Sequence, residues 1–333
     1  MPRSLRSSAL AAALLAALFA VASSSGAAPK APAPAPAPAA APSPPVPLLW
    51  KVSDADNAIY LLGSFHLLKA DDYPLSKDVD AAFDDAESVA FEVAPAEMAS
   101  PQLAMSMVRA GLRTDGKTLG ETLPPETAAK FDAWLKANEA TLGKMGLPPT
   151  ALQSFEPWYV GLVVSLTEMG KLGLDPANGL DNRMGQRAEA SGKQTLGLER
   201  SEDQIALLDG MTPEEQLQFL SESLGDAENA TSEIGNMHAA WRRGDADALL
   251  HDMGAEMRSE YPALYQRINV ARNDAWVPKL QVMLDDAHGR DTLVVVGSLH
   301  LLGEDGVVEK LRAKGYRVER ICSLCDSAVG RSR

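Results

Sequence analysis

The stretch Tyr60-Leu61-Leu62-Gly63-Ser64-Phe65-His66-Leu67-Leu68 has a counterpart late in the chain, at Val295-Val296-Gly297-Ser298-Leu299-His300-Leu301-Leu302. Each copy reads as an apolar strand that ends in Gly-Ser-x-His and continues into a loop and a helix. A single histidine after a strand is often a core residue, whereas two in the same frame indicate one shared site. We therefore predict that His66 and His300 meet in space.

Strand and helix signals surround the first copy. Residues 47–52 and 58–63 are β-rich runs separated by the polar turn 53–57, so they predict a hairpin whose second strand leads to the first histidine. Ser76 is a candidate N-cap for the helix that follows, and residues 87–93 return to a strand pattern. The first copy therefore predicts a β-His-loop-α-β unit.

The second copy repeats this order. Residues 292–296 are a continuous β-branched run, 303–306 a glycine-containing loop, 307–311 the apolar stripe of a helix, and 316–321 a strand. Crossovers of this kind are right-handed and gather the loops after the strands along one sheet edge, where ligands bind in open α/β sheets. The sequence predicts an α/β (α+β) fold with a central mixed sheet built from two β-His-loop-α-β units.

The chain between the two units is mostly helical, which predicts a large helical insertion packed over the sheet or into it. Amphipathic spacing predicts helices over 124–143, 156–170, 179–191, 212–224 and 261–287. Residues 193–199 are the exception, a predicted short strand that ends in the carboxylate of Glu199.

Both ends of the chain are predicted to lie outside the fold. Residues 1–22 combine a basic start, a short apolar run and a small-x-small site, which indicates a cleaved signal peptide and a periplasmic or secreted protein; an uncleaved membrane anchor is the alternative. Residues 23–47 are rich in alanine and proline and predict a disordered linker. One domain is predicted over 48–326, with a disordered tail at 327–333. No stable membrane insertion is expected after cleavage.

The charge balance excludes one class of partner. The formal net charge is -14, from 31 Lys and Arg against 45 Asp and Glu, and the folded region has no basic run. Binding to phosphate backbones needs clustered basic residues, so we predict no nucleic-acid partner. The charge does not identify the partner, which we take to be a peptide or small-molecule substrate, and the sequence predicts no oligomeric state.

Cys322 and Cys325 are the two cysteines of the chain. In an exported protein, a local disulfide that ties down the tail is favoured over a redox motif, because no strand-to-helix context follows the pair. A zinc site from this pair alone would lack two ligands.

The twin motifs favour a metal centre. A hydrolytic metal site needs imidazole or carboxylate ligands on rigid elements, with one position open for water. We predict that His66, His300 and Glu92 bind a divalent metal, because Glu92 interrupts an apolar strand beside the first histidine. An outward-facing carboxylate at a sheet edge is the alternative for Glu92. The sequence does not decide between manganese, cobalt and zinc. Four motif residues are predicted to support the site by close backbone approach or by their hydroxyls: Gly63, Ser64, Gly297 and Ser298.

At these residues the chain resembles the TraB/PrgY/GumN family, whose members share two Gly-x-x-His motifs and include TIKI-type metalloproteases. The resemblance extends over the folded region and includes Phe91-Glu92, Gly179-Leu180-Asp181, Gly197-Leu198-Glu199 through Gln204, and Arg272-Asn273-Asp274-Ala275-Trp276. It implies a fold like that of erythromycin esterase and ChaN-like proteins. For the TIKI-type members it implies a metal-dependent peptidase centred on two histidines and a glutamate.

Further site residues follow from the same resemblance. Arg272 and Asn273 are expected to steady a developing oxyanion or a substrate carboxylate; a solvated helix face is the alternative. Asp181 and Glu199 are expected to support the site, although Glu199 could equally cap the helix that begins near Ser201.

Three functions remain open at this stage. The first is an exported metal-dependent hydrolase, most simply a peptidase, in which Glu92 holds the metal or takes the proton of water. The second is a non-catalytic regulatory protein of the same fold that binds haem, metal or a peptide. The third is a metal-free esterase in which a histidine and Glu92 act as general acid and base.

Overall fold

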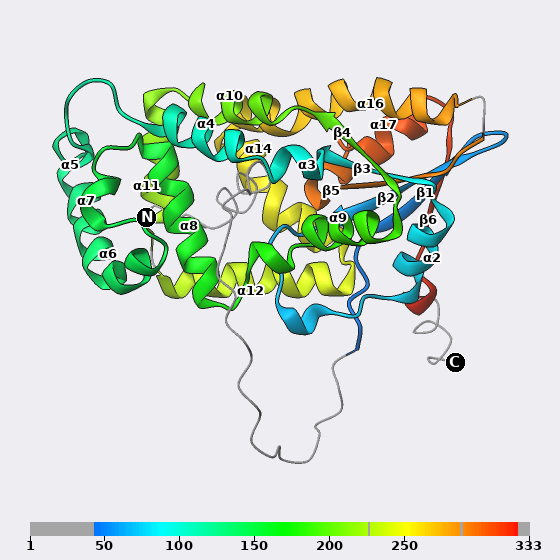
Figure 1. Cartoon of the computed structure of the whole chain (residues 1–333), viewed down its shortest axis with the longest axis horizontal. Coiled ribbons are helices and arrows are strands. Elements are labelled where there is room, and N and C mark those ends of the chain that lie inside the picture. Colours follow the sequence, from blue (N-terminus) through cyan, green and yellow to red (C-terminus); the bar gives the residue numbers. More distant parts are fainter. Residues whose placement is uncertain (1–42, 226, 287–288, 326–333) are drawn as a thin grey trace, which may run out of the picture.

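The computed structural model describes residues 43–225, 227–286 and 289–325. A six-stranded mixed sheet lies at one end of the molecule, and helices α5 to α8 and α11 gather at the other end (Figure 1). The strands are β1 (Leu49–Ser53), β2 (Ala58–Ser64), β3 (Ser88–Val93), β4 (Gln194–Glu199), β5 (Thr292–Gly297) and β6 (Arg317–Arg320). The predicted α/β class with a central mixed sheet is confirmed.

The order of the strands is β4-β3-β5-β2-β1-β6. The first four strands in this order are parallel, while β1 runs antiparallel to both of its neighbours, β2 and β6. Every residue of β2 and β5 is buried, as expected for the central strands of a covered parallel sheet. Each fully buried Leu or Val side chain there contributes about 1.5–3 kcal/mol to folding. The predicted hairpin is confirmed by the pairing of β1 with β2.

The two predicted units interleave. The first unit supplies β2 and β3, and β5 of the second unit lies between them. The second unit then ends in β6, beyond the β2–β1 hairpin of the first. As a result β2 and β5 are paired neighbours, with Ser64 opposite Gly297. This pairing brings the two histidine motifs to the same sheet edge.

Helices cover the sheet and fill the insertion. Helix α16 contacts β2 and β4, while α9 contacts β3, β4 and β5 from the opposite side of the sheet (Figure 1). The first helices are η1 (Ala70–Asp72), α2 (Lys77–Asp85), α3 (Pro95–Met98), α4 (Pro101–Gly111), α5 (Leu119–Thr122), α6 (Pro125–Lys144), α7 (Pro149–Leu152), α8 (Pro157–Lys171) and η2 (Pro176–Asn178). They are followed by α9 (Leu180–Ser191), α10 (Ser201–Asp209), α11 (Pro213–Ser223), α12 (Ala227–Arg243), α13 (Ala246–Leu250), η3 (His251–Ala255) and α14 (Glu256–Glu260). The last are α15 (Pro262–Tyr265), η4 (Gln266–Val270), α16 (Ala271–Leu284), η5 (Ser298–Leu301) and α17 (Val307–Ala313).

The helical insertion has a hydrophobic core of its own. Residues of α5 to α8 and α11 form a cluster separate from the main core, and it includes Phe131, Phe155 and Leu220. Helix α8 joins the two cores, because Trp158 packs in the main core while Val163 packs in the second. The insertion is therefore firmly connected to the part of the chain that carries the sheet.

Most predicted elements are confirmed, and one differs. The helices predicted over 124–143, 156–170, 179–191 and 212–224 correspond to α6, α8, α9 and α11, and the strand predicted over 193–199 corresponds to β4. The single long helix expected over 261–287 is instead α15, the π-helical segment η4 and α16. Such π segments are common beside functional sites.

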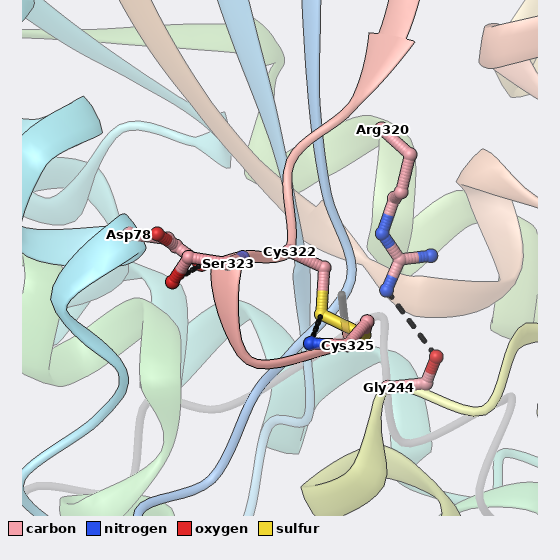
Figure 2. The surroundings of a disulfide bond; sticks show 6 residues. All are labelled: Asp78, Gly244, Arg320, Cys322, Ser323 and Cys325. Carbon is pink, nitrogen blue, oxygen red and sulfur yellow. Dashed lines mark hydrogen bonds between the residues drawn. A yellow bond between two sulfur atoms is a disulfide. The ribbon is translucent and has the colours of Figure 1, made fainter. Parts of the chain in front are cut away.

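A disulfide joins Cys322 and Cys325, as the sequence analysis favoured (Figure 2). Ser323, between them, donates from its amide and its hydroxyl to Asp78 of α2. The disulfide closes a short local loop, and the hydrogen bonds to Asp78 hold this loop to α2.

Residues 1–42 and 326–333 lie outside the described residues. They include the predicted signal peptide, most of the predicted linker and the predicted tail. Among the described residues, no helix is long and apolar enough to cross a membrane.

Candidate functional site

The two histidines converge on one carboxylate at the carboxyl edge of the parallel strands. His66 follows β2, His300 lies in η5 directly after β5, and Glu92 is near the end of β3. The Nε2 atoms of His66 and His300 lie 4.0 Å and 3.9 Å from the same oxygen, Oε1 of Glu92. The structure therefore brings the three predicted metal ligands together.

Gly297 lies where these side chains meet. A Cβ atom added to Gly297 would sit 3.1 Å from Nε2 of His66, 3.3 Å from Oε1 of Glu92 and 3.5 Å from Cδ2 of His300. The amide of Gly297 also donates to Oε1 of Glu92 at 2.7 Å. Because Gly297 has no side chain, the point on which the three side chains converge stays open. This is the close backbone approach that was predicted for Gly297.

His66 is held from outside by Asp181. Its Nδ1 donates to Oδ2 of Asp181 at 2.6 Å, and the hydroxyl of Ser64 donates to the same oxygen at 2.7 Å. Burial lowers the pKa of His66, but the Asp181 carboxylate outweighs this effect and the net pKa is raised. This arrangement turns Nε2 of His66 inward, where it is buried and has no hydrogen-bond partner.

His66 and Asp181 form the more exposed side of the site. The side chains of His66 and Asp181 are 14% and 28% exposed, whereas those of Glu92 and Arg272 are each 6% exposed. A ligand approaching from solvent would therefore meet His66 before the deeper groups.

His300 is held by Asn273 in a corresponding way. Its Nδ1 donates to Oδ1 of Asn273 at 2.7 Å, while Nδ2 of Asn273 donates to the backbone oxygen of Asp305 at 2.8 Å. Burial lowers the pKa of His300 well below its ordinary value, and Arg272 and His66 lower it further, so His300 is neutral at pH 7. Both ends of the Asn273 amide are engaged. Asn273 therefore positions His300, and the oxyanion role expected for it stays a prediction.

Arg272 crosses the centre of the site from α16. Its Nη2 lies 2.5 Å from Oε2 of Glu92 and 2.5 Å from Oε1 of Glu199, and its Nη1 donates to Nε2 of His300 at 3.0 Å. Burial lowers the pKa of Arg272, but Glu92 and Glu199 raise it by more, so the guanidinium stays charged. The solvated helix face, the alternative for Arg272, is excluded by this burial.

Glu199 serves as an anchor for Arg272. Both of its carboxylate oxygens accept from Nε of Arg272 at 3.1 Å, and Oε2 also accepts from the indole of Trp276 at 2.9 Å. Gln204 donates to Glu199 at 2.7 Å and to Glu92 at 3.3 Å. Glu199 therefore belongs to the site and has no hydrogen bond that caps α10.

The two remaining motif residues support the backbone. Ser298 donates to the carbonyl of Ser64 at 2.9 Å, across β5 and β2. The carbonyl of Gly63 accepts from the indole of Trp241 in α12 at 3.0 Å. Both contacts fix the strand ends from which the histidines extend.

The site carries an excess of negative charge. Among the linked side chains there are three carboxylates, those of Glu92, Asp181 and Glu199, and one guanidinium, that of Arg272, which leaves two formal negative charges when both histidines are neutral. Burial raises the pKa of Glu92, although Arg272 opposes this. Buried charges need partners, so a divalent cation would balance the site.

A divalent metal fits these donors by type and orientation. Imidazole nitrogen and carboxylate oxygen bind zinc and related transition metals. Each histidine is oriented through Nδ1, the usual arrangement behind a metal-binding Nε2, and the buried Nε2 of His66 has no other partner. Three residues, His66, His300 and Glu92, are the ones that would hold the metal.

The spacing limits this fit. Within residues 43–325, apart from the undescribed positions, no three His, Cys, Asp or Glu side chains are grouped closely enough to hold a metal ion. The only lone pair of His300 Nε2 already accepts a hydrogen bond from Arg272. A metal held by all three side chains therefore requires them to move closer, and metal binding stays a prediction.

A model of the TraB/PrgY/gumN family matches residues 48–320 of the chain. The chain belongs to this family. The matched residues run from β1 to β6 and include every side chain of the site. The resemblance inferred from the twin motifs is thus confirmed.

The chain is similar in sequence to two relatives that differ in how much is known of them. The chain is 28% identical over 172 residues to the uncharacterized protein YbaP of Escherichia coli (strain K12), which covers 51% of this chain and 61% of YbaP. It is 24% identical over 305 residues to the metalloprotease TIKI2 of Danio rerio, which covers 78% of this chain and 58% of TIKI2. The chain thus spans about three fifths of each relative. No solved structure matches it.

Proposed function

We propose that this TraB/PrgY/gumN protein is an exported, metal-dependent hydrolase that cleaves peptide bonds. The observation that carries the proposal is the convergence of His66 and His300 on Oε1 of Glu92, each histidine being held through Nδ1. Membership of a family that includes a relative named as a metalloprotease supports the hydrolase class.

When bound, a divalent metal would supply Lewis acidity and lower the pKa of water at the site. The residues of the chain do the rest. Glu92 has two alternative roles: it holds the metal with the histidines or, where the histidines hold it, accepts the proton of the attacking water, which suits a carboxylate whose pKa is raised by burial. Asp181 and Asn273 keep the inner nitrogens of the two histidines directed at the reacting centre.

Arg272 is the group that stabilises developing negative charge. Its guanidinium is anchored by Glu199 next to Glu92 and His300, so it can pair with an oxyanion in the site while it keeps that anchor. Burial strengthens that interaction, because a water-poor site has a low effective dielectric constant.

Export is part of the proposal. The predicted signal peptide of residues 1–22 motivates it, and the Cys322–Cys325 disulfide supports it, because disulfides persist in oxidising compartments. Mass spectrometry of the protein recovered from periplasmic and culture fractions tests this. Full-length protein confined to the cytosol would contradict export.

The test of the hydrolase is metal content measured together with cleavage. We expect the purified protein to bind one divalent metal, to lose cleavage of fluorescein-labelled casein after chelation, and to regain it with manganese, cobalt or zinc. His66→Ala and His300→Ala should lose both metal and activity. His251→Ala is the matched control, because this exposed histidine begins η3 outside the site.

The other outcomes separate the competing functions. Ester hydrolysis that survives complete chelation would indicate the metal-free esterase, in which a histidine and Glu92 act as general acid and base. Metal or haem bound without any cleavage would indicate the regulatory binder. Equal metal content in wild type and both histidine variants would refute the proposed centre.

A further inference from the structure

We propose that Arg272 is an internal competitor for the metal, a cation of the chain itself that occupies the inner faces of His300 and Glu92 and withdraws onto Glu199 when a divalent ion binds. This inference rests on the proposed function and concerns the control of that same site. It goes beyond the oxyanion role, because it assigns Arg272 a task before any substrate arrives.

The competition follows from the contacts of two ligand atoms. Nε2 of His300 has one lone pair, and it accepts from Nη1 of Arg272 at 3.0 Å. Oε2 of Glu92 accepts from Nη2 of Arg272 at 2.5 Å. A metal cannot use the nitrogen of His300 while the guanidinium holds it. Metal and guanidinium therefore compete for the same lone pair.

Arg272 already has the partners that it would need after withdrawing. Its Nε and Nη2 contact the carboxylate of Glu199, its Nη1 also donates to the carbonyl of Ile268 at 3.2 Å, and its guanidinium lies 4.8 Å from the ring of Trp276. After a shift of the guanidinium away from His300 and Glu92, each of its three nitrogens would still have one acceptor, in Glu199 or in the carbonyl of Ile268. The displaced state requires no unpaired buried charge, which would be costly.

The charge of the site allows a divalent metal and Arg272 to be present together. Three carboxylates and Arg272 leave two negative charges, which a divalent ion would cancel with the arginine still present. Arg272 therefore only needs to change contacts and can stay in the site. Metal can bind only when Arg272 is not in contact with His300 and Glu92. The apparent affinity for metal is therefore the intrinsic affinity multiplied by the fraction of molecules in which this contact is broken.

The test uses a variant that removes the contact and keeps the charge. Arg272→Met combined with Glu199→Gln deletes one positive and one negative charge, so the formal charge of the site is unchanged. Glu92 loses its contact with Arg272 but keeps the Gly297 amide and Gln204 as hydrogen-bond donors. The matched control is Arg267→Met with Glu215→Gln. That pair has the same chemistry at 2.7 Å, lies in the preceding η4 segment and α11, and touches neither histidine.

The readout is the Kd of manganese, cobalt and zinc, measured by isothermal titration calorimetry on the full chain, with circular dichroism to confirm folding. Among the three metals, we take the one that binds wild type most tightly. We expect the double variant to bind this metal at least about tenfold more tightly than wild type does, a difference of about 1.4 kcal/mol. The control pair should stay within about twofold of wild type.

Each result decides the inference. Metal binding by the double variant alone, or tighter than in wild type, supports it. Equal or weaker binding by the double variant, with metal still bound by wild type, overturns it and leaves the proposed function standing. Binding by neither protein overturns both.

If the double variant does not fold, Arg272→Lys takes its place, because an ammonium keeps the charge but lacks the planar fork that reaches Glu92 and His300 together. Tighter binding than in wild type then supports the inference. Unchanged or weaker binding overturns it.

Discussion

Replacing Gly297 by alanine should abolish the function of the site without unfolding the protein. The backbone of Gly297 has φ -51° and ψ 137°, which alanine adopts without strain. The added methyl group, however, would lie 3.1 Å from Nε2 of His66 and 3.3 Å from Oε1 of Glu92. Both separations are shorter than a comfortable contact of about 3.5–4.0 Å, so each group must retreat by a few tenths of an ångström.

The size of the effect follows from where the methyl group lies. A metal needs its ligands at about 2.0–2.2 Å, and the methyl group pushes them outward from the point on which they converge. Misplacement of reacting groups by about 1 Å costs about 10²-fold, and the shift here is a few tenths of an ångström, so we expect kcat/KM to fall by up to about 10²-fold and metal content to drop in parallel. The free energy of unfolding should change by less than about 1.5 kcal/mol, within the range of a mild core overpacking.

The assay pairs casein cleavage and metal analysis with a thermal melt. Gly170→Ala is the control, because Gly170 lies in α8 and a Cβ there would have no neighbour within 4 Å. That variant should keep full activity and gain up to about 1 kcal/mol, as alanine is the better helix former. Wild-type activity and metal content in Gly297→Ala would refute the reasoning, because the open point between the ligands would then have no function.

Three other variants test separate parts of the structure. Asp181→Asn removes the carboxylate that orients His66, so metal affinity from calorimetry should fall about 10–100-fold while the protein stays folded. Asp72 is fully buried against Arg242 and His238; burial raises its pKa, these partners outweigh that effect, and the net pKa lies below its ordinary value. Its stabilisation is therefore complete above about pH 4 and is lost as pH falls through the lower folded pKa, so urea unfolding of wild type should weaken with acid more steeply than that of Asp72→Asn. Cys322→Ser opens a disulfide between residues only three apart in sequence, so the free energy of unfolding should fall by about 2 kcal/mol or less.

The strands and the shared edge were predictable because their signals are local. Continuous apolar runs mark β2 and β5, and the repeated Gly-Ser-x-His after each run indicates that both histidines belong to one site. Parallel strands place their carboxyl ends together, so the convergence followed from topology rules without knowledge of the strand order.

The strand order itself was not predictable, since no local pattern states that β5 inserts between β2 and β3. The same holds for polar partners that meet only in the folded protein. Asp181 was expected to support the site and Asn273 to face an oxyanion, and no sequence pattern indicated that each would bind one histidine.

Gln204 and Trp276 were noted in the family motif without a role, and they bind Glu199. Gln204 lies one helical turn into α10, close behind the end of β4, and this position after a strand was the signal that could have placed it at the edge.

The interleaving of the two units has a consequence for how the protein is made. A chain that emerges from its N-terminus presents β2 and β3 well before β5, the strand that separates and pairs with both, has been synthesised. Since β5 also delivers Gly297 and His300, we expect no partial chain to have catalytic power. A ribosome-bound or truncated product that ends before residue 292 lacks Gly297 and His300 and leaves the edges of β2 and β3 unpaired, so it should have no complete site and be prone to aggregation.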